Sequence, residues 1–194
     1  MKKLLISSFE PFGGEQINSS RQAVEALPNE IGAYSLTKIC IPVVFGEAAD
    51  RVIAAADALS PDVIISVGQA AGRDAITPEM VGINLRYAKI PDNSGYEPKD
   101  EIIFEDGERA YFSTLPVRKM AEAVNNAGVP ASVSYSAGAY VCNDVLYILL
   151  KHFENSKTKV GFIHVPCSKE QNKQISMDIN DIVKGLTAAI ESLD

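Results

Sequence analysis

Two hydrophobic periods alternate along the chain. Strands are predicted at residues 2–8, 34–43, 62–68, 131–137 and 159–165, and the continuous apolar run at 62–68 is typical of a strand buried on both faces. Stretches with apolar residues on one helical face predict helices at residues 18–27, 46–59, 117–128, 142–153 and 179–193. Strands that alternate with helices indicate an α/β sandwich with a mixed sheet. We expect one domain over residues 1–194.

Turn and capping residues divide these elements. Ser19 and Gln22 have the spacing of a capping box, which predicts the start of the first helix. The middle of the chain, residues 79–115, departs from the alternation because Pro, Asn and Gly residues interrupt it repeatedly. We expect this part to be an insertion that carries a hairpin, with residues 93–112 at its centre.

Composition and charge exclude several classes of function. The 194 residues are 46% hydrophobic and 22% charged, with a formal net charge of -7, which argues against nucleic acid or an anionic membrane surface as partner. No apolar run approaches the roughly 18 to 20 residues of a membrane span. Three cysteines without Cys-x-x-Cys spacing, and no secretory signal, predict a reducing cytoplasm. Small molecules or peptides are the expected partners.

In open α/β sheets, ligands bind beyond the carboxyl ends of the strands, which directs attention to the two histidines. His164 ends the strand "VGFIHV" and is a candidate general base, although a core histidine is an alternative. His152 lies in the last turn of a helix, where an imidazole interacts well with the terminal carbonyl groups. We therefore assign it no catalytic role.

Cys142 begins the helix "CNDVLYILLKHF" and is the candidate nucleophile. A thiol in the first helical turn feels the positive end of the helix dipole, which predicts a lowered pKa, and the same N–H groups can hold an oxyanion. The alternative is a small apolar residue on the buried face of the helix. Cys40 is expected to be inert core. Cys167 forms a His-x-x-Cys pair with His164, but the chain has no second pair for a metal.

A Cys-His pair normally requires a third group that orients the imidazole. Glu79 is the best candidate because it begins an apolar strand just after a loop of small residues. A solvated carboxylate at a strand start is the alternative, and Asp74, Asp92 and Glu10 are rival candidates.

Five motifs in one order resemble those of the pyroglutamyl peptidase I family of cysteine peptidases. They are "FEPFGGEQINSS", "GQAAGRDAITPEMVGIN", "AKIPDNSG", "SAGAYVCNDVLYILL" and "GFIHVPCSKEQ". The resemblance runs from residue 4 to about residue 171, nearly the whole chain. It implies an α/β/α sandwich of the phosphorylase/hydrolase-like type and removal of an N-terminal pyroglutamyl residue from peptides through a thioester.

By this resemblance, Cys142 is the nucleophile, His164 the general base and then acid, and Glu79 the residue that orients His164. No metal or cofactor is implied, and members of the family often form homotetramers. The resemblance also implies a substrate-binding pocket. Its residues are Phe9, Phe12, Asn18, Gln69, Lys89, Ile90, Tyr140 and Val141.

The expected pocket roles follow from the chemistry of the pyroglutamyl ring. Phe9 and Phe12 supply flat apolar walls for a compact uncharged ring, with a hydrophobic plug under the loop as the alternative. Asn18 and Gln69 are expected near the lactam or the adjoining peptide, although Asn18 could equally cap a helix. A free amino terminus would lose its hydration in such a pocket without a counter-charge.

The sequence departs from the family pattern at four positions. Lys89 replaces an arginine, so charge is kept without the planar fork, and Tyr140 replaces a phenylalanine, so its hydroxyl requires a partner. Ser8 replaces a glycine and Cys167 an aromatic residue. These changes affect the expected rate and specificity, while the predicted triad is intact.

Three other functions are compatible with parts of the pattern. A nucleoside phosphorylase on the same fold would need a phosphate site, and the chain has no glycine-rich phosphate loop with suitable Arg and Ser residues. A non-catalytic binder of pyroglutamyl-like ligands would bind without hydrolysis. A structural domain with buried cysteines would label slowly and uniformly with iodoacetamide.

Overall fold

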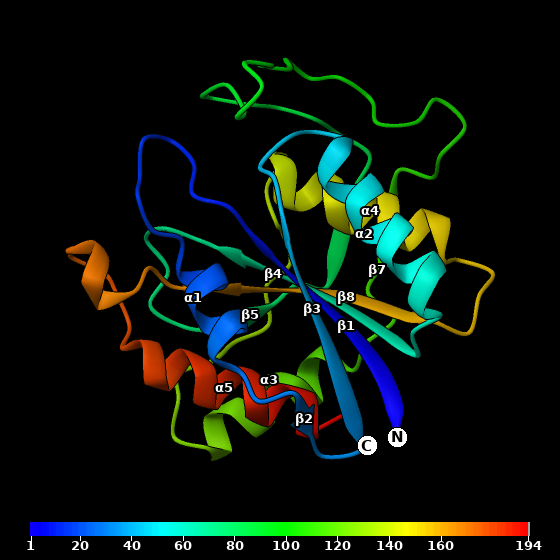
Figure 1. Ribbon diagram of the computed structural model, residues 1–194. Coiled ribbons are helices and arrows are strands. Elements are labelled where there is room, and N and C mark those ends of the chain that lie inside the picture. Colours follow the sequence, from blue (N-terminus) through cyan, green and yellow to red (C-terminus); the bar gives the residue numbers. More distant parts are fainter. Residues whose placement is uncertain (194) are drawn as a thin grey trace.

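A six-stranded sheet forms the centre of the protein (Figure 1). The computed structural model describes residues 1–193. The strand order is β2-β3-β1-β4-β8-β5. Four long strands run parallel, namely β1 (Lys2–Phe9), β3 (Tyr34–Ile41), β4 (Val63–Gln69) and β8 (Lys159–Val165). The short strands β2 (Glu30–Ile31) and β5 (Thr77–Pro78) are antiparallel to their neighbours and form the two edges.

Helices cover both faces of the sheet and make three layers (Figure 1). On one face lie α1 (Ser19–Ala26), α3 (Val117–Asn126) and α5 (Ile179–Glu191), and on the other lie α2 (Glu47–Leu59) and α4 (Val141–His152). Because successive side chains of a strand point to opposite faces, Leu4 and Ile6 of β1 pack with the first group and Leu5 with the second. The expected α/β sandwich with a mixed sheet is confirmed.

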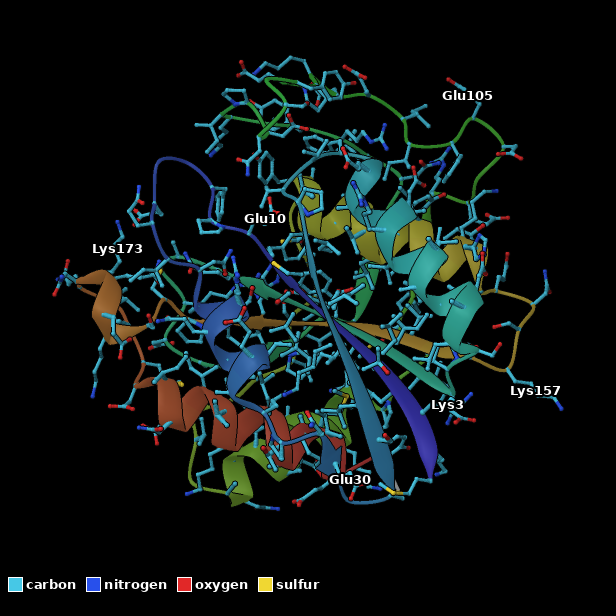
Figure 2. The ribbon with its side chains drawn as sticks, in the orientation of Figure 1. Lys3, Glu10, Glu30, Glu105, Lys157 and Lys173 are labelled. Atoms are coloured by element: carbon cyan, nitrogen blue, oxygen red, sulfur yellow. The ribbon has the colours of Figure 1, made fainter. Side chains whose placement is uncertain are left out.

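The parallel strands bring their carboxyl ends to one edge of the sheet. Figure 2 shows Lys3 in β1 and Lys157 just before β8 at one end of the molecule, and Glu10 just after β1 toward the other. The last residues of β1, β4 and β8 therefore meet at the same edge. This edge is where a ligand site is expected in an open α/β sheet.

The predicted insertion is present as two short paired strands with a long segment between them. The strands β6 (Val81–Ile83) and β7 (Ala110–Phe112) pair antiparallel as a separate two-stranded sheet. Residues 84–109 between them, green in Figure 1, run past the ends of α2 and α4. Within this segment, Arg86 and Glu101 form an isolated bridge.

Two local predictions are wrong. Residues 131–137 form no strand, because only isolated bridges join Ala131 to Ile76 and Ser134 to Glu79. The capping box is also absent from α1, since the N-cap is Asn18, whose side chain accepts a hydrogen bond from the Ser20 N–H at 3.0 Å.

None of the helices in residues 1–193 is both long and apolar enough to cross a membrane. A 3₁₀ turn, η1 (Lys169–Gln171), follows β8.

Candidate active site

A cavity of about 410 Å³ opens at the carboxyl edge of the sheet. It collects side chains from the ends of β1, β4 and β8, from the start of α4 and from four loops. Its lining residues are Phe9, Phe12, Asn18, Val43, Gln69, Ala70, Ala71, Arg73, Ser136, Ala137, Gly138, Tyr140, Val141, Cys142 and His164.

Cys142 reaches this cavity as the second residue of α4, with Tyr140 at the N-cap. The hydrogen bonds of the first turn begin with the Asp144 N–H, which donates to the Tyr140 carbonyl at 3.1 Å. The N–H groups of Cys142 and Asn143 therefore precede the intrahelical ladder. Cys142 as a whole residue is partly exposed and lines the cavity, so the position combines a cysteine in the cavity wall with backbone donors that can hold an oxyanion.

His164 reaches the cavity on the α4 side of the sheet because of its register in β8. Val160 and Phe162 pack in the layer that contains α4, and the two-residue period of a strand turns His164 to the same side. Its imidazole lies over Phe162, with ring centroids 4.8 Å apart. Both His164 and Cys142 line the cavity.

Glu79 lies behind His164, fully buried, just after β5. Its Oε1 is 2.7 Å from His164 Nδ1. An ionised carboxylate only accepts hydrogen bonds, so we assign the imidazole proton to Nδ1, and Nε2 is then left to accept a proton. The structure thus pairs Glu79 with His164 and places His164 and Cys142 in the wall of the same cavity.

Burial and neighbouring charge set the ionisation of this group. Burial raises the pKa of the Cys142 thiol to about 12, and the Glu79 charge adds to this. Burial also lowers the pKa of His164, and it outweighs the opposing effect of Glu79. For Glu79, burial raises the pKa, but the hydrogen bonds with His164 and Arg73 outweigh burial and hold the pKa below its ordinary value. The resting site therefore holds a thiol, a neutral imidazole and a carboxylate.

This ionisation corrects the sequence prediction for Cys142. The position at the helix N-terminus predicts a lowered thiol pKa, but in the folded protein desolvation dominates and the pKa is raised. Sequence shows the helix start, whereas it does not show how deeply the sulfur is enclosed.

Arg73 is a site residue that the sequence analysis missed. Its Nη1 donates to Glu79 Oε1 at 2.7 Å and to Thr77 Oγ1 at 2.5 Å, and its Nη2 donates to the Ser136 carbonyl at 3.1 Å. The motif "GQAAGRDAITPE" contains this arginine six residues before Glu79, which was the available signal. An arginine in a loop of small residues does not by itself indicate which carboxylate it pairs with.

Aromatic and aliphatic side chains form one half of the cavity. Phe9 is buried at the end of β1 against Phe162, and Phe12 lies beside Tyr140 with ring centroids 6.3 Å apart. The Tyr140 hydroxyl donates to the Pro91 carbonyl at 3.1 Å, so this hydroxyl has the partner that its position at the pocket edge requires. Burial raises the pKa of Tyr140 to about 12.

Gln69 and Asn18, the two predicted polar residues, both line the cavity but differ in whether their side-chain amides are already hydrogen-bonded. Among residues 1–193, both hydrogen bonds of the Gln69 side chain use Oε1, which accepts from the N–H and the hydroxyl of Ser19 at 2.8 and 3.1 Å. Its Nε2 amide therefore remains to donate to a ligand. Asn18 instead caps α1 through Oδ1 and donates through Nδ2 to the Glu10 carbonyl at 3.1 Å. The helix-cap alternative for Asn18 is thus the role that the structure shows, although its side chain also lines the cavity.

Lys89 and Ile90 are not among the residues that line this cavity. They line a neighbouring apolar hollow of about 260 Å³, which shares Phe12 and Tyr140 with the main cavity. The predicted direct contact of Lys89 and Ile90 with the substrate is therefore not supported by this geometry. Their motif places them on the outer side of the aromatic wall.

The other sequence candidates lie away from His164. Cys40 is exposed at the end of β3, which corrects its assignment to the core, and Cys167 is buried outside the cavity lining. Asp74 and Glu10 are exposed, and Asp92 accepts backbone hydrogen bonds from Phe45, Ser94 and Tyr96. Within residues 1–193, no three His, Cys, Asp or Glu side chains gather as metal ligands would.

Comparison with known proteins gives a consistent result over the whole chain. The profile of the family described as pyroglutamyl peptidase matches residues 2–194. The pyrrolidone-carboxylate peptidase of Lactobacillus johnsonii is 46% identical over 197 residues, covering 98% of this chain and 92% of the relative. The corresponding protein of Staphylococcus haemolyticus is 49% identical, with 98% and 93% covered.

Solved structures agree with the sequence comparison. The crystal structure of pyroglutamyl peptidase I from Bacillus amyloliquefaciens superposes with a TM-score of 0.95 at 40% identity, covering 100% of this chain and 97% of that chain. The pyrrolidone carboxyl peptidase of Thermococcus litoralis has a TM-score of 0.95 at 35% identity, with 100% and 93% covered.

Proposed function

Because the chain belongs to the pyroglutamyl peptidase family, a family of cysteine peptidases, we propose that it hydrolyses the bond after an N-terminal pyroglutamyl residue with Cys142, His164 and Glu79 as its catalytic group. The observation that carries this proposal is the arrangement at the cavity. Cys142 and an imidazole held by a buried carboxylate line one cavity, and among residues 1–193 no acidic side chain contributes to its lining.

The reaction begins with a neutral pair of catalytic groups. His164 Nε2 removes the Cys142 proton as the sulfur attacks the exocyclic carbonyl carbon of the pyroglutamyl residue, so that a C–S bond forms and the carbonyl oxygen becomes an oxyanion. The raised pKa of the thiol and the lowered pKa of the imidazole support general-base removal of the proton during attack. Ionised Glu79 stabilises the imidazolium that forms.

The oxyanion then collapses and the peptide leaves. The N–H groups at the first turn of α4 stabilise the oxyanion, and the C–N bond breaks as the imidazolium gives its proton to the leaving amine. His164 next takes a proton from water, which attacks the thioester and releases pyroglutamate. The proton returns to the sulfur, and the resting thiol is restored.

The cavity lining supports recognition of an uncharged ring. Phe9, Phe12 and Tyr140 supply apolar faces, and Gln69 Nε2 is placed to donate to the lactam carbonyl. A free α-ammonium group would be desolvated here without a carboxylate to compensate its charge, which is costly. The leaving peptide would extend over the other half of the cavity, along residues 70–73 and 136–138.

From the family resemblance we also propose an assembly and a location, the latter being the cytoplasm. A homotetramer is the expected assembly. Cys40, Cys142 and Cys167 are all free thiols, as a reducing cytoplasm would keep them.

The proposed function is tested by release of a fluorescent amine from a pyroglutamyl amide. We expect the wild type to hydrolyse the amide and Cys142→Ser to lose at least about 1,000-fold in kcat, because serine is a much weaker nucleophile without a lowered pKa. Cys40→Ser is the matched control, since this thiol is exposed and outside the cavity. It should stay within about twofold of the wild type.

Two outcomes would contradict the proposal. Activity retained in Cys142→Ser would remove the nucleophile assignment. A wild type that binds pyroglutamate in a calorimetric titration but releases no amine would be a non-catalytic binder.

A further inference from the structure

Arg73 contacts the buried carboxylate from the side of the cavity. Residues 70–73 form a turn in which the Arg73 N–H donates to the Ala70 carbonyl at 3.3 Å, and Gly72 adopts a φ of 86°. Glycine is favoured at this positive φ. The turn directs the arginine back toward Glu79, and the side chain is 30% exposed while that of Glu79 is fully buried.

The guanidinium is fixed by three acceptors from different segments. Nη1 donates to Glu79 Oε1 and to Thr77 Oγ1 at the end of the sheet, and Nη2 donates to the Ser136 carbonyl just before α4. Since Ser136 precedes the helix that carries Cys142, the same side chain joins the carboxylate segment to the nucleophile segment. A Lys side chain has the charge but not the planar fork that makes these contacts.

Arg73 and His164 share one oxygen of the carboxylate. Glu79 Oε1 lies 2.7 Å from both Arg73 Nη1 and His164 Nδ1, whereas the buried Oε2 has no hydrogen-bond partner among residues 1–193. The imidazole is neutral at rest, so Arg73 is the charged partner that compensates the buried carboxylate. An unpaired charge in this position would be strongly destabilised.

We propose that Arg73 is a positioning residue of the reaction, which holds Glu79 ionised with Oε1 against His164 Nδ1 and thereby keeps Nε2 directed at Cys142. This inference rests on the proposed function for its kinetic consequences. Arg73 also faces His164 as a nearby cation and so opposes its protonation. The charged and titratable groups around the imidazole are Glu79 after β5, Arg73 in the loop after β4 and Cys142 on α4.

The test compares Arg73→Met with Arg73→Lys. For Arg73→Met we expect kcat to fall about 10- to 100-fold with KM changed less than about threefold, because the contacts are to the catalytic group and misalignment costs rate. The acidic limb of the kcat/KM profile should move upward by about 0.5 to 1 pH unit, since loss of the cation raises the pKa of His164. Compared with Arg73→Met, Arg73→Lys keeps the positive charge but not the planar fork. Its acidic limb should therefore lie closer to that of the wild type, while its kcat stays reduced.

A second readout does not depend on activity. The chain has two histidines, so NMR titration of the Cys142→Ser protein gives one signal from His164 and one from exposed His152, which serves as an internal reference. Adding Arg73→Met should raise the pKa of His164. This separates failure of the inference from failure of the proposed function, because the titration stands even if no amide is hydrolysed.

Arg51→Met is the matched control for charge removal. Arg51 also pairs with a glutamate, Glu47 at 3.0 Å, but on the exposed surface of α2. It should change neither the pH profile nor the His164 titration. The inference would be overturned if, in both Arg73→Met and Arg73→Lys, neither the acidic limb of the kcat/KM profile nor the His164 titration moved and kcat stayed within about threefold of the wild type. Thermal unfolding of each variant identifies loss of the fold.

Discussion

At the scale of single residues, the absence of one side chain decides how the nucleophile meets its base. Gly68 of β4 lies opposite His164 in the sheet register. A Cβ at Gly68 would lie 2.9 Å from Cys142 Sγ and 2.8 Å from a ring carbon of Phe162. The sulfur therefore occupies space that any other residue at position 68 would fill.

Gly68→Ala should lower kcat about 10- to 100-fold, because the new methyl group displaces the thiol or the ring beneath His164. Steady-state kinetics with a pyroglutamyl amide, together with the midpoint of thermal unfolding, measures this effect. Gly161→Ala in β8 is the control, since its Cβ would lie 2.4 Å from Leu115 in the other core and should reduce stability while kcat is kept. A folded Gly68→Ala protein with kcat within twofold of the wild type would contradict the assignment.

The sequence predicted the chemical identity of the site better than its electrostatics. Cys142, His164 and Glu79 could be proposed from helix starts, strand ends and the family resemblance, and the structure brings all three together. The raised pKa of Cys142 and the role of Arg73 could not be predicted, because both depend on burial and on contacts between distant segments.

At the scale of elements, the insertion contributes to the pocket through its backbone turn. Asn93 Nδ2 donates to the Pro11 carbonyl at 3.1 Å, and the Asn93 N–H donates to the Val43 carbonyl at 2.9 Å. Tyr140 adds its bond to the Pro91 carbonyl. Residues 91–93 thus tie together three segments that carry cavity walls, and we infer that the insertion holds these walls in place.

Asn93→Ala should raise KM for a pyroglutamyl amide about fivefold with kcat nearly unchanged, because one hydrogen bond of about 1 kcal/mol to the opening loop is lost. Asn125→Ala is the control, since that side chain bonds to Ala131 beside α3 on the opposite face of the sheet. It should affect stability but not KM. Equal KM values for wild type and Asn93→Ala would show that the opening loop keeps its position without this contact.

Elements with strong periodicity could be predicted, whereas weakly specified ones could not. The helix at residues 117–128 has four apolar residues on one face, and all four are buried in α3. Residues 131–137 alternate small residues without a long apolar run, and tertiary contacts reduce them to isolated bridges beside β5. The cap of α1 shifts from Ser19 to Asn18, because the Asn side chain reaches the Ser20 N–H.

At the scale of the whole molecule, the distribution of charge distinguishes the cavity from the rest of the surface. The chain has 25 Asp and Glu residues and a formal net charge of -7, yet none of the acidic side chains within residues 1–193 lines the cavity. The buried carboxylate of Glu79 is already compensated by the charge of Arg73 and accepts a hydrogen bond from His164. An acidic protein thus presents a site without an anion for a free amino terminus.

The most direct test of the account is the ratio of kcat/KM for a pyroglutamyl amide to that for a prolyl amide. The two rings have similar shape, but the prolyl ring carries a charged amine and lacks the lactam carbonyl. We predict a ratio of at least about 100, because the charge is desolvated without compensation and a hydrogen bond is lost. A ratio near one would contradict the claim that the cavity selects an uncharged lactam ring.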